Sequence, residues 1–179
     1  MTWQTLSSKI VYHNPWIKIQ EDQVIQPNGN NSLYGFLIKV PGVFVIAETE
    51  FEEIYLIEEY RYPLKKNILQ LPSGIIEGKL SPEATAAKEL FEETGIRASN
   101  FQNLGKFYIA PGHETTEIYA VKATGLEISE FGIHQEGDES IQNIKKFAID
   151  EVKQMIISNK ISCGLTLAAL NLYFCNQEK

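Results

Sequence analysis

The chain has 179 residues and a mass of 20.3 kDa, which suits one domain, or one domain with a small appendage. Its hydrophobic residues, 44% of the total, are too many for a disordered protein. Its 16 Lys and Arg and 23 Asp and Glu give a formal charge of −7, which argues against a protein that coats nucleic acid or an anionic membrane. A small anionic substrate stays compatible with this charge, because a bound metal reverses the local sign.

Other features predict a cytoplasmic protein without a membrane segment. No apolar run reaches the length of a membrane span, and the first residues lack the apolar stretch of a signal peptide. Cys163 and Cys175 both fall in an apolar segment and are interpreted as small buried side chains. Two cysteines without disulfide or metal spacing favour a reducing compartment.

The first half of the chain is typical of β structure. Short runs rich in β-branched and aromatic residues predict strands over 9–12, 17–25, 33–40, 43–47 and 54–60. The turn residues Pro27–Asn30 indicate a hairpin between the second and third runs. Pro41-Gly42 then interrupts the pattern, and we expect it to divide an N-terminal β subdomain, residues 1–41, from a main domain, residues 42–179.

The second half adds helices. Ser81 as N-cap, Pro82 at the first helical position and Gly95 as a stop predict a helix whose body is 84–94. Further patterns predict strands over 101–109 and 117–122, a loop over 111–116, and helices over 150–158 and 165–174. Because strands and helices mix, the expected fold class is α/β or α+β with layers of both.

The predicted helix carries Glu89, Glu92 and Glu93 at spacings that place all three on one face. Like charges at this spacing repel, and Glu92 and Glu93 lie in the last turn, where the helix dipole is also unfavourable for acids. A solvated acidic face would produce the same pattern, but acids that serve only solubility are better placed in the first turn. A divalent cation would offset both costs, and all-oxygen ligation suits Mg²⁺ or Mn²⁺.

The loop before this helix, Leu71–Gly78, contains Gly74, which allows backbone carbonyls and a phosphate to approach a metal. Together, Gly74, Glu89-Leu90, Glu92-Glu93 and Gly95-Ile96 resemble the signature of the Nudix hydrolase family. The resemblance implies an α/β/α sandwich with a mixed sheet.

Two positions depart from that signature. The family's first Glu falls on Leu80, and its Arg falls on Lys88, which keeps the charge but not the two-pronged hydrogen bonding. We expect the loop to be repacked, with Leu80 buried where an ion pair would otherwise lie. The departures bear on metal geometry and rate more than on fold.

Flanking segments resemble the ADP-ribose pyrophosphatase subgroup. The similar segments are Asn14–Ile17, Glu59–Pro63, Leu69–Gly74, Pro111–Glu117 and Asp138–Ile141. The resemblance implies metal-dependent hydrolysis of the diphosphate of a nucleoside diphosphate sugar, with ADP-ribose as the expected substrate and GDP-mannose or another nucleotide sugar as the alternative. It also implies a homodimer in which the N-terminal strands exchange or pack between the two copies.

The resemblance assigns roles to individual residues. Glu89, Glu93 and the carbonyl of Ser73 are expected to bind the metal, while Glu92 would bind a further ion or assist the attacking water, and Gly74 would admit the substrate. The acidic loop 135–140 is expected to supply the catalytic base, with Glu139 preferred over Glu136 and a solvated loop as the alternative. Trp16 is left open between base stacking and core packing.

Arg61 is expected to hold a substrate phosphate, unless it forms only a surface ion pair with a neighbouring acid. A second function also stays open. The departures at Leu80 and Lys88 are compatible with a non-catalytic nucleotide-binding or regulatory module on the same fold.

Overall fold

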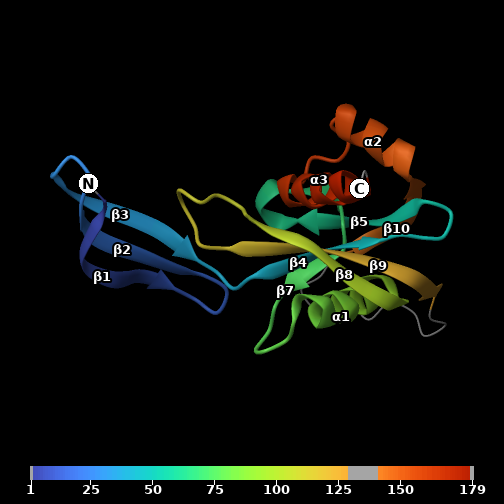
Figure 1. The fold of residues 1–179 in the computed structure, drawn as a ribbon, viewed down its shortest axis with the longest axis horizontal. Coiled ribbons are helices and arrows are strands. Elements are labelled where there is room, and N and C mark those ends of the chain that lie inside the picture. The colour runs from blue at the N-terminus through green and yellow to red at the C-terminus, as the bar shows by residue number, and fades with distance from the viewer. Residues whose placement is uncertain (1, 129–140, 178–179) are drawn as a thin grey trace. The chain divides into compact units, whose positions relative to one another are not determined.

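The computed structural model describes residues 2–128 and 141–177, which form two compact units (Figure 1). The first unit contains the chain up to Pro41 together with the segment Tyr108–Glu117. The second contains Gly42–Phe107 and the chain from Ile118 onward. The sequence analysis places the segment 108–117 in the larger domain, whereas the structure groups it with the N-terminal strands.

The first unit is a three-stranded antiparallel sheet of β1 (Gln4–His13), β2 (Lys18–Ile25) and β3 (Asn31–Ile38). The expected hairpin at Pro27–Asn30 is confirmed, since Ile25 pairs with Asn31 and Gly29 adopts φ 89° in the turn. The segment 108–117 lies against β3. The Leu37 N–H donates to the His113 carbonyl at 2.8 Å, and the Thr115 N–H donates to the Leu37 carbonyl at 3.1 Å.

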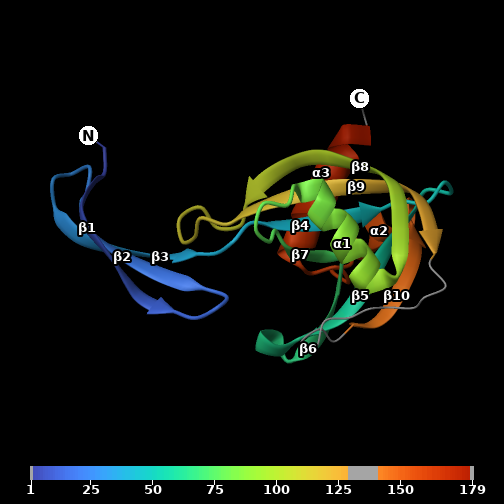
Figure 2. The same cartoon turned by 90° about the horizontal axis from the view of Figure 1, so that it is seen from below.

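The second unit contains two sheets (Figure 2). One has the order β7-β4-β9-β8, in which β4 (Gly42–Ala47) pairs parallel with β9 (Glu117–Ile128) and antiparallel with β7 (Ser73–Ile75), with β8 (Ile96–Tyr108) outermost. The other is antiparallel with the order β10-β5-β6, formed by β10 (Ile141–Ala148), β5 (Glu53–Arg61) and β6 (Lys66–Gln70). The 3-10 turn η1 (Tyr62–Leu64) joins β5 to β6. The four-stranded sheet is mixed, as expected, because β4 pairs parallel with β9 and antiparallel with β7.

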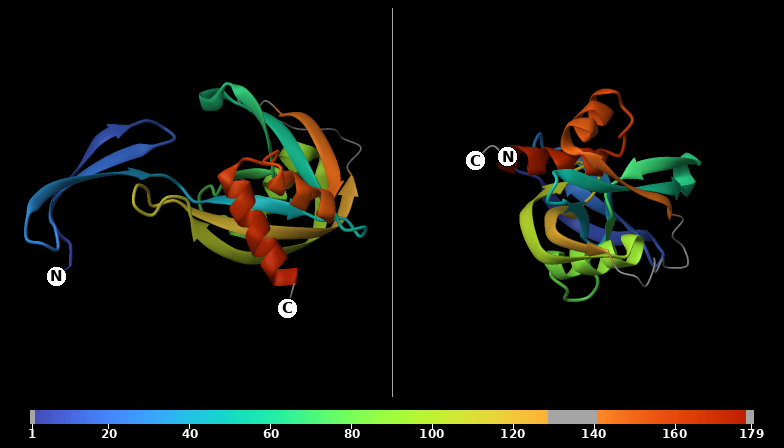
Figure 3. Two further views of the ribbon diagram at one scale, coloured as in Figure 1. Left: turned by 90° about the horizontal axis from the view of Figure 1, so that it is seen from above. Right: turned by 90° about the vertical axis from the view of Figure 1, so that its right-hand side faces the viewer.

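Three helices cover these sheets. Helix α1 (Pro82–Thr94) packs on β4 and β7, α2 (Ile149–Ile157) on β5 and β10, and α3 (Gly164–Gln177) on β4. Figures 1 and 3 show α1 on one side and α2 and α3 on the other. Strand β4 is buried along its whole length because helices cover both of its faces. One core cluster contains Val43, Val45, Ala47, Ala86, Leu90, Ile96, Val121 and Ala123.

The signals for α1 are confirmed. The Ser81 hydroxyl accepts from the Ala84 N–H at 3.1 Å, and Gly95 ends the helix at φ 71° while its N–H donates to the Phe91 carbonyl. The other two helices are also confirmed, with bounds shifted by a few residues. Strands β6, β7 and β10 were not predicted.

The structure also bears on the burial of the two cysteines and on the expected absence of a membrane segment. Cys163 is half-buried and Cys175 is exposed, so the interpretation of both as buried side chains is wrong, although both thiols are unpaired. No helix within residues 2–128 and 141–177 combines the length and the apolar character needed to cross a bilayer.

Candidate active site

Helix α1 brings two buried carboxylates to one place. Glu89 exposes 6% of its surface and Glu93 exposes 2%, while Glu92, on the same helix, is less buried. Buried carboxylates cost free energy unless hydrogen bonds or opposite charges compensate them. The spacing inferred from the sequence therefore produces two inward acids and one that lies nearer the surface.

Strand β7 packs its backbone against these acids. The Ser73 N–H donates to Oε2 of Glu93 at 2.8 Å, which orients that carboxylate. Gly74 lies so close to the carboxyl group of Glu89 that a methyl group at this position would overlap it. Glycine permits this approach because it has no side chain, and the Glu89 carboxyl group occupies the space that a side chain would take.

Lys88 places a cation beside this cluster. Its Nζ lies 3.0 Å from Glu92 and 3.7 Å from Glu89. The lysine therefore keeps the charge of the arginine expected at this position, and it pairs with Glu92 along the helix.

Arg61, at the end of β5, belongs to a second polar group. Its Nη1 lies 2.8 Å from Oε1 of Glu59, and its Nε–H donates to Oε1 of Gln70 at 3.1 Å. Gln70 in turn donates from Nε2 to Oε2 of Glu59 at 3.0 Å. The side chain of Arg61 is 40% exposed, whereas Glu59 and Gln70 are buried. The ion pair with a neighbouring acid, one of the two expectations for Arg61, is present.

Comparisons with known proteins identify the family of this chain. The model of the NUDIX domain matches residues 38–162, and the model of the nucleoside diphosphate sugar hydrolase N-terminal domain matches residues 3–37. The first of these matches covers more than half of the chain. This chain belongs to the Nudix hydrolase family.

The relatives of this Nudix hydrolase share most of its length. It is 33% identical to the methanol dehydrogenase activator of Bacillus methanolicus and 27% identical to the ADP-ribose pyrophosphatase of Bacillus subtilis, in each case over 93% of this chain and 90% of the relative. A crystal structure of an ADP compounds hydrolase superposes with a TM-score of 0.85, covering 97% of this chain and 92% of that one at 18% identity. The expected sandwich fold is thereby confirmed.

Nudix hydrolases generally use divalent metal ions, and the residues present fit such an ion. Among the described residues, no three Asp, Glu, His or Cys side chains converge on one point. Mg²⁺ does not need such a cage, because it keeps several waters and usually takes one or two protein carboxylates plus substrate phosphates. Glu89 and Glu93 are two buried carboxylates packed beside the backbone of Ser73 and Gly74, which is the number of protein carboxylates that such an ion usually takes.

The structure corrects one expectation, and another falls on residues that it does not describe. Leu80 is 43% exposed, so the expectation that it is buried in place of an ion pair is wrong. The acidic loop with Glu136 and Glu139 lies outside the described residues. Trp16 is 70% exposed, which excludes the alternative of core packing.

Glu59 and Gln70 belong to the polar group of Arg61 although the sequence alone indicates no role for them within the flanking motifs. They lie on neighbouring strands because Ile57 pairs with Gln70 in the β5–β6 register, which brings the two side chains together across the hairpin. A buried polar side chain among apolar strand residues was the available signal, since such a group needs partners.

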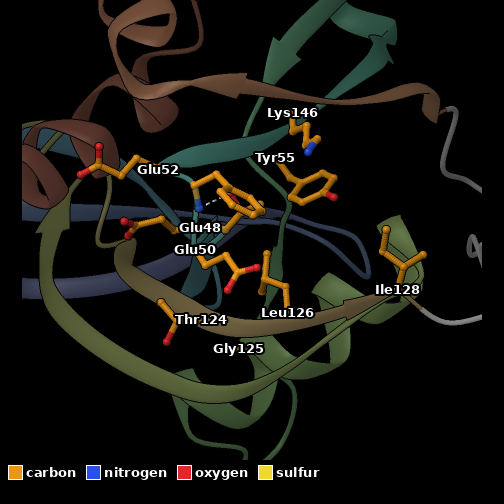
Figure 4. A pocket seen from close by; sticks show the side chains of 11 residues that line it. Glu48, Glu50, Glu52, Tyr55, Thr124, Gly125, Leu126, Ile128 and Lys146 are labelled. Atoms are coloured by element: carbon orange, nitrogen blue, oxygen red, sulfur yellow. Dashed lines mark hydrogen bonds between the residues drawn. The ribbon is translucent and has the colours of Figure 1, made fainter.

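The pocket in Figure 4 lies elsewhere in the second unit. It encloses about 560 Å³ beside the β4–β5 turn, and Glu48, Glu50 and Glu52 line it together with Tyr55 and Lys146. Among the described residues, none of those expected in the site lines this pocket. Beside this pocket, Lys146 pairs with Glu53 at 2.7 Å, which lowers the pKa of Glu53 and raises the pKa of Lys146.

Proposed function

We propose that this Nudix hydrolase cleaves the diphosphate of a nucleoside diphosphate sugar, with ADP-ribose as its substrate and Mg²⁺ or Mn²⁺ as its metal. The observation that carries the proposal is the pair of buried carboxylates, Glu89 and Glu93, packed on the glycine loop. The N-terminal family match names nucleoside diphosphate sugar hydrolases, and two relatives at 27% and 26% identity are ADP-ribose pyrophosphatases.

In the proposed reaction, water attacks one phosphorus of the diphosphate and the bridging P–O bond breaks. The water oxygen stays on the attacked phosphorus, its proton goes to a base, and the products are AMP and ribose phosphate. When bound, a divalent ion supplies neutralisation of the diphosphate charge and acidifies a water.

The protein's own residues have the following proposed roles. Glu89, Glu93 and the Ser73 carbonyl hold the metal, and Gly74 admits the substrate phosphates to the loop. Glu92 binds a further ion or orients the water. Its carboxylate also pairs with Lys88 at 3.0 Å. Arg61 binds a phosphate oxygen, and Glu139 takes the proton.

The proposal is tested with a substrate panel. Purified protein is incubated with ADP-ribose, GDP-mannose and other nucleotide sugars, each with Mg²⁺ or Mn²⁺, and products are identified by chromatography. Preferential release of AMP from ADP-ribose supports the proposal. Preference for GDP-mannose would replace the substrate, in line with the relative from Yersinia pestis named GDP-mannose pyrophosphatase, which is 24% identical over 123 residues.

A second candidate function is regulation of a partner enzyme, because the relative with 33% identity is named as a methanol dehydrogenase activator. Adding the protein to a methanol dehydrogenase assay tests it, with the Glu93→Gln variant in parallel. Activation by both forms favours a regulatory module that does not need catalysis. Nucleotide binding without products in the panel points to the same module.

We also propose a homodimer that uses the N-terminal unit, residues 1–41, and a cytoplasmic location. The exposed apolar residues of the three-stranded sheet support the dimer. The unpaired thiols of Cys163 and Cys175 support the reducing location.

A further inference from the structure

The polar group around Arg61 is a closed ring of three side chains. Glu59 contacts Arg61 at 2.8 Å, Arg61 donates to Gln70 at 3.1 Å, and Gln70 donates to Glu59 at 3.0 Å. Gln70 is 1% exposed and Glu59 is 7% exposed, so the ring is anchored in the protein interior. Within the described residues, these contacts occupy the Nε and one N–H of Nη1, and three of the five guanidinium N–H donors remain for other partners.

Glutamine is the side chain that closes this ring. Its amide accepts from the arginine with Oε1 and donates to the carboxylate with Nε2 at the same time. A glutamate at position 70 would set a second carboxylate against Glu59, and a leucine would offer neither bond. Because Gln70 is buried, water cannot easily replace the bonds that it makes.

We propose that Gln70 is a positioning residue that fixes the Arg61 guanidinium in one orientation, with its outer N–H groups directed at the diphosphate of the substrate. This inference rests on the proposed function. An arginine that is already ordered loses little side-chain entropy when the anion binds. The planar guanidinium then presents two N–H groups in a fixed geometry, which suits phosphate oxygens.

The first test is kinetic and uses the full chain. Gln70→Leu is expected to raise KM for ADP-ribose about tenfold while kcat is unchanged, because the Arg61 guanidinium is then no longer ordered before the substrate binds. Gln70→Glu is expected to raise KM as well. The double variant Glu59→Gln/Gln70→Glu exchanges amide and carboxylate, rebuilds the ring and is expected to restore most of the wild-type KM.

The second test does not depend on activity. The Nε–H resonance of Arg61, assigned by its loss in Arg61→Lys, is expected to show slow exchange with water in the wild type. Exchange should be about tenfold faster in Gln70→Leu and slow again in the double variant. Asn67→Ala is the matched control, because Asn67 lies on the same strand but is exposed and bonds to Gln142. It should change neither KM nor the Arg61 signal.

The outcomes separate the two proposals. A folded Gln70→Leu protein with wild-type KM and slow Nε–H exchange would overturn the positioning role, as would a folded double variant no better than Gln70→Leu. If exchange responds as expected but the wild type hydrolyses no nucleotide sugar, the ordering of Arg61 is supported and the proposed function fails. Thermal melts of every variant identify those that do not fold.

Discussion

Among single residues, Glu93 is the one on which the proposed metal site depends most. Glu93→Gln keeps an oxygen that accepts from the Ser73 N–H, so the fold should be retained. It removes the buried negative charge, and the turnover of ADP-ribose should fall at least about 100-fold. Stabilisation by Mg²⁺ in a thermal melt should fall with it.

Glu83→Gln is the matched control, since Glu83 lies in the first turn of the same helix, away from the glycine loop. It should leave turnover and the response to Mg²⁺ unchanged. Undiminished turnover in Glu93→Gln would remove Glu93 from the metal site.

Gly74 gives a second prediction at this scale. Gly74→Ala introduces a methyl group where the Glu89 carboxyl group already lies, so this buried side chain must move away from the loop. The free energy of unfolding should fall by about 1–3 kcal/mol, as in other overpacked sites. Turnover should fall as well, because the Glu89 carboxylate is displaced from its position beside the loop.

The comparison is Gly164→Ala, where nothing lies within 4 Å of the added methyl group. Chemical denaturation of both variants should show a loss only for Gly74→Ala. Equal unfolding free energies for the two variants would contradict the close approach of loop and helix.

Between elements, the pair Glu53–Lys146 links the start of β5 to β10. Lys146 lowers the pKa of Glu53 below its usual 4.5, so this carboxylate favours the folded state when it is ionised. Its contribution is present above pH 4.5 and is lost as the pH falls through the lower pKa of the folded state.

Lys146→Met should therefore reduce the loss of thermal stability between about pH 5 and pH 3 relative to the wild type. Melting temperatures measured across this range check the prediction. Because the pair is exposed, the effect should be small and should weaken further in high salt. Parallel pH profiles for both proteins would show that the pair does not couple to folding.

The elements also differ in how well the sequence predicts them. Local signals predict an element well, whereas pairing with distant strands leaves no local pattern. The helix α1 was predicted with both ends because Ser81, Pro82 and Gly95 act on their own neighbours. Strand β7 has three residues and exists because it pairs with β4, which no local pattern records. Strand β10 carries lysines and polar residues, so its place beside β5 is also set by partners distant in sequence.

The candidate site divides in the same way. Glu89 and Glu93 were found because helical periodicity places them together. The Glu59–Gln70 contact depends on the register of a hairpin, and the exposure of Leu80 depends on how a loop packs, so neither could be derived from spacing.

At the scale of the whole molecule, the proposed homodimer is the main prediction. Exposed apolar residues on the first unit include Trp3, Leu6, Ile10 and Leu33, with between 48% and 62% of each exposed. A monomeric protein rarely presents so many together, so a second copy is expected to cover them. Sedimentation should give twice the chain mass of 20.3 kDa.

Ile10→Lys should shift this equilibrium to the monomer by placing a charge in the interface. Ile157→Lys is the control, because Ile157 is 76% exposed at the end of α2 in the other unit. A wild-type monomer at micromolar concentration would reject the dimer.

The assignment of Tyr108–Glu117 to the first unit also limits how this protein can be dissected. The polypeptide crosses from one unit to the other three times, after residues 41, 107 and 117. Excising the first 41 residues would deprive the His113 carbonyl and the Thr115 N–H of their partner Leu37, leaving a frayed connection between β8 and β9. The first unit is thus built from two separate stretches of the chain, and a cut after residue 41 would divide it.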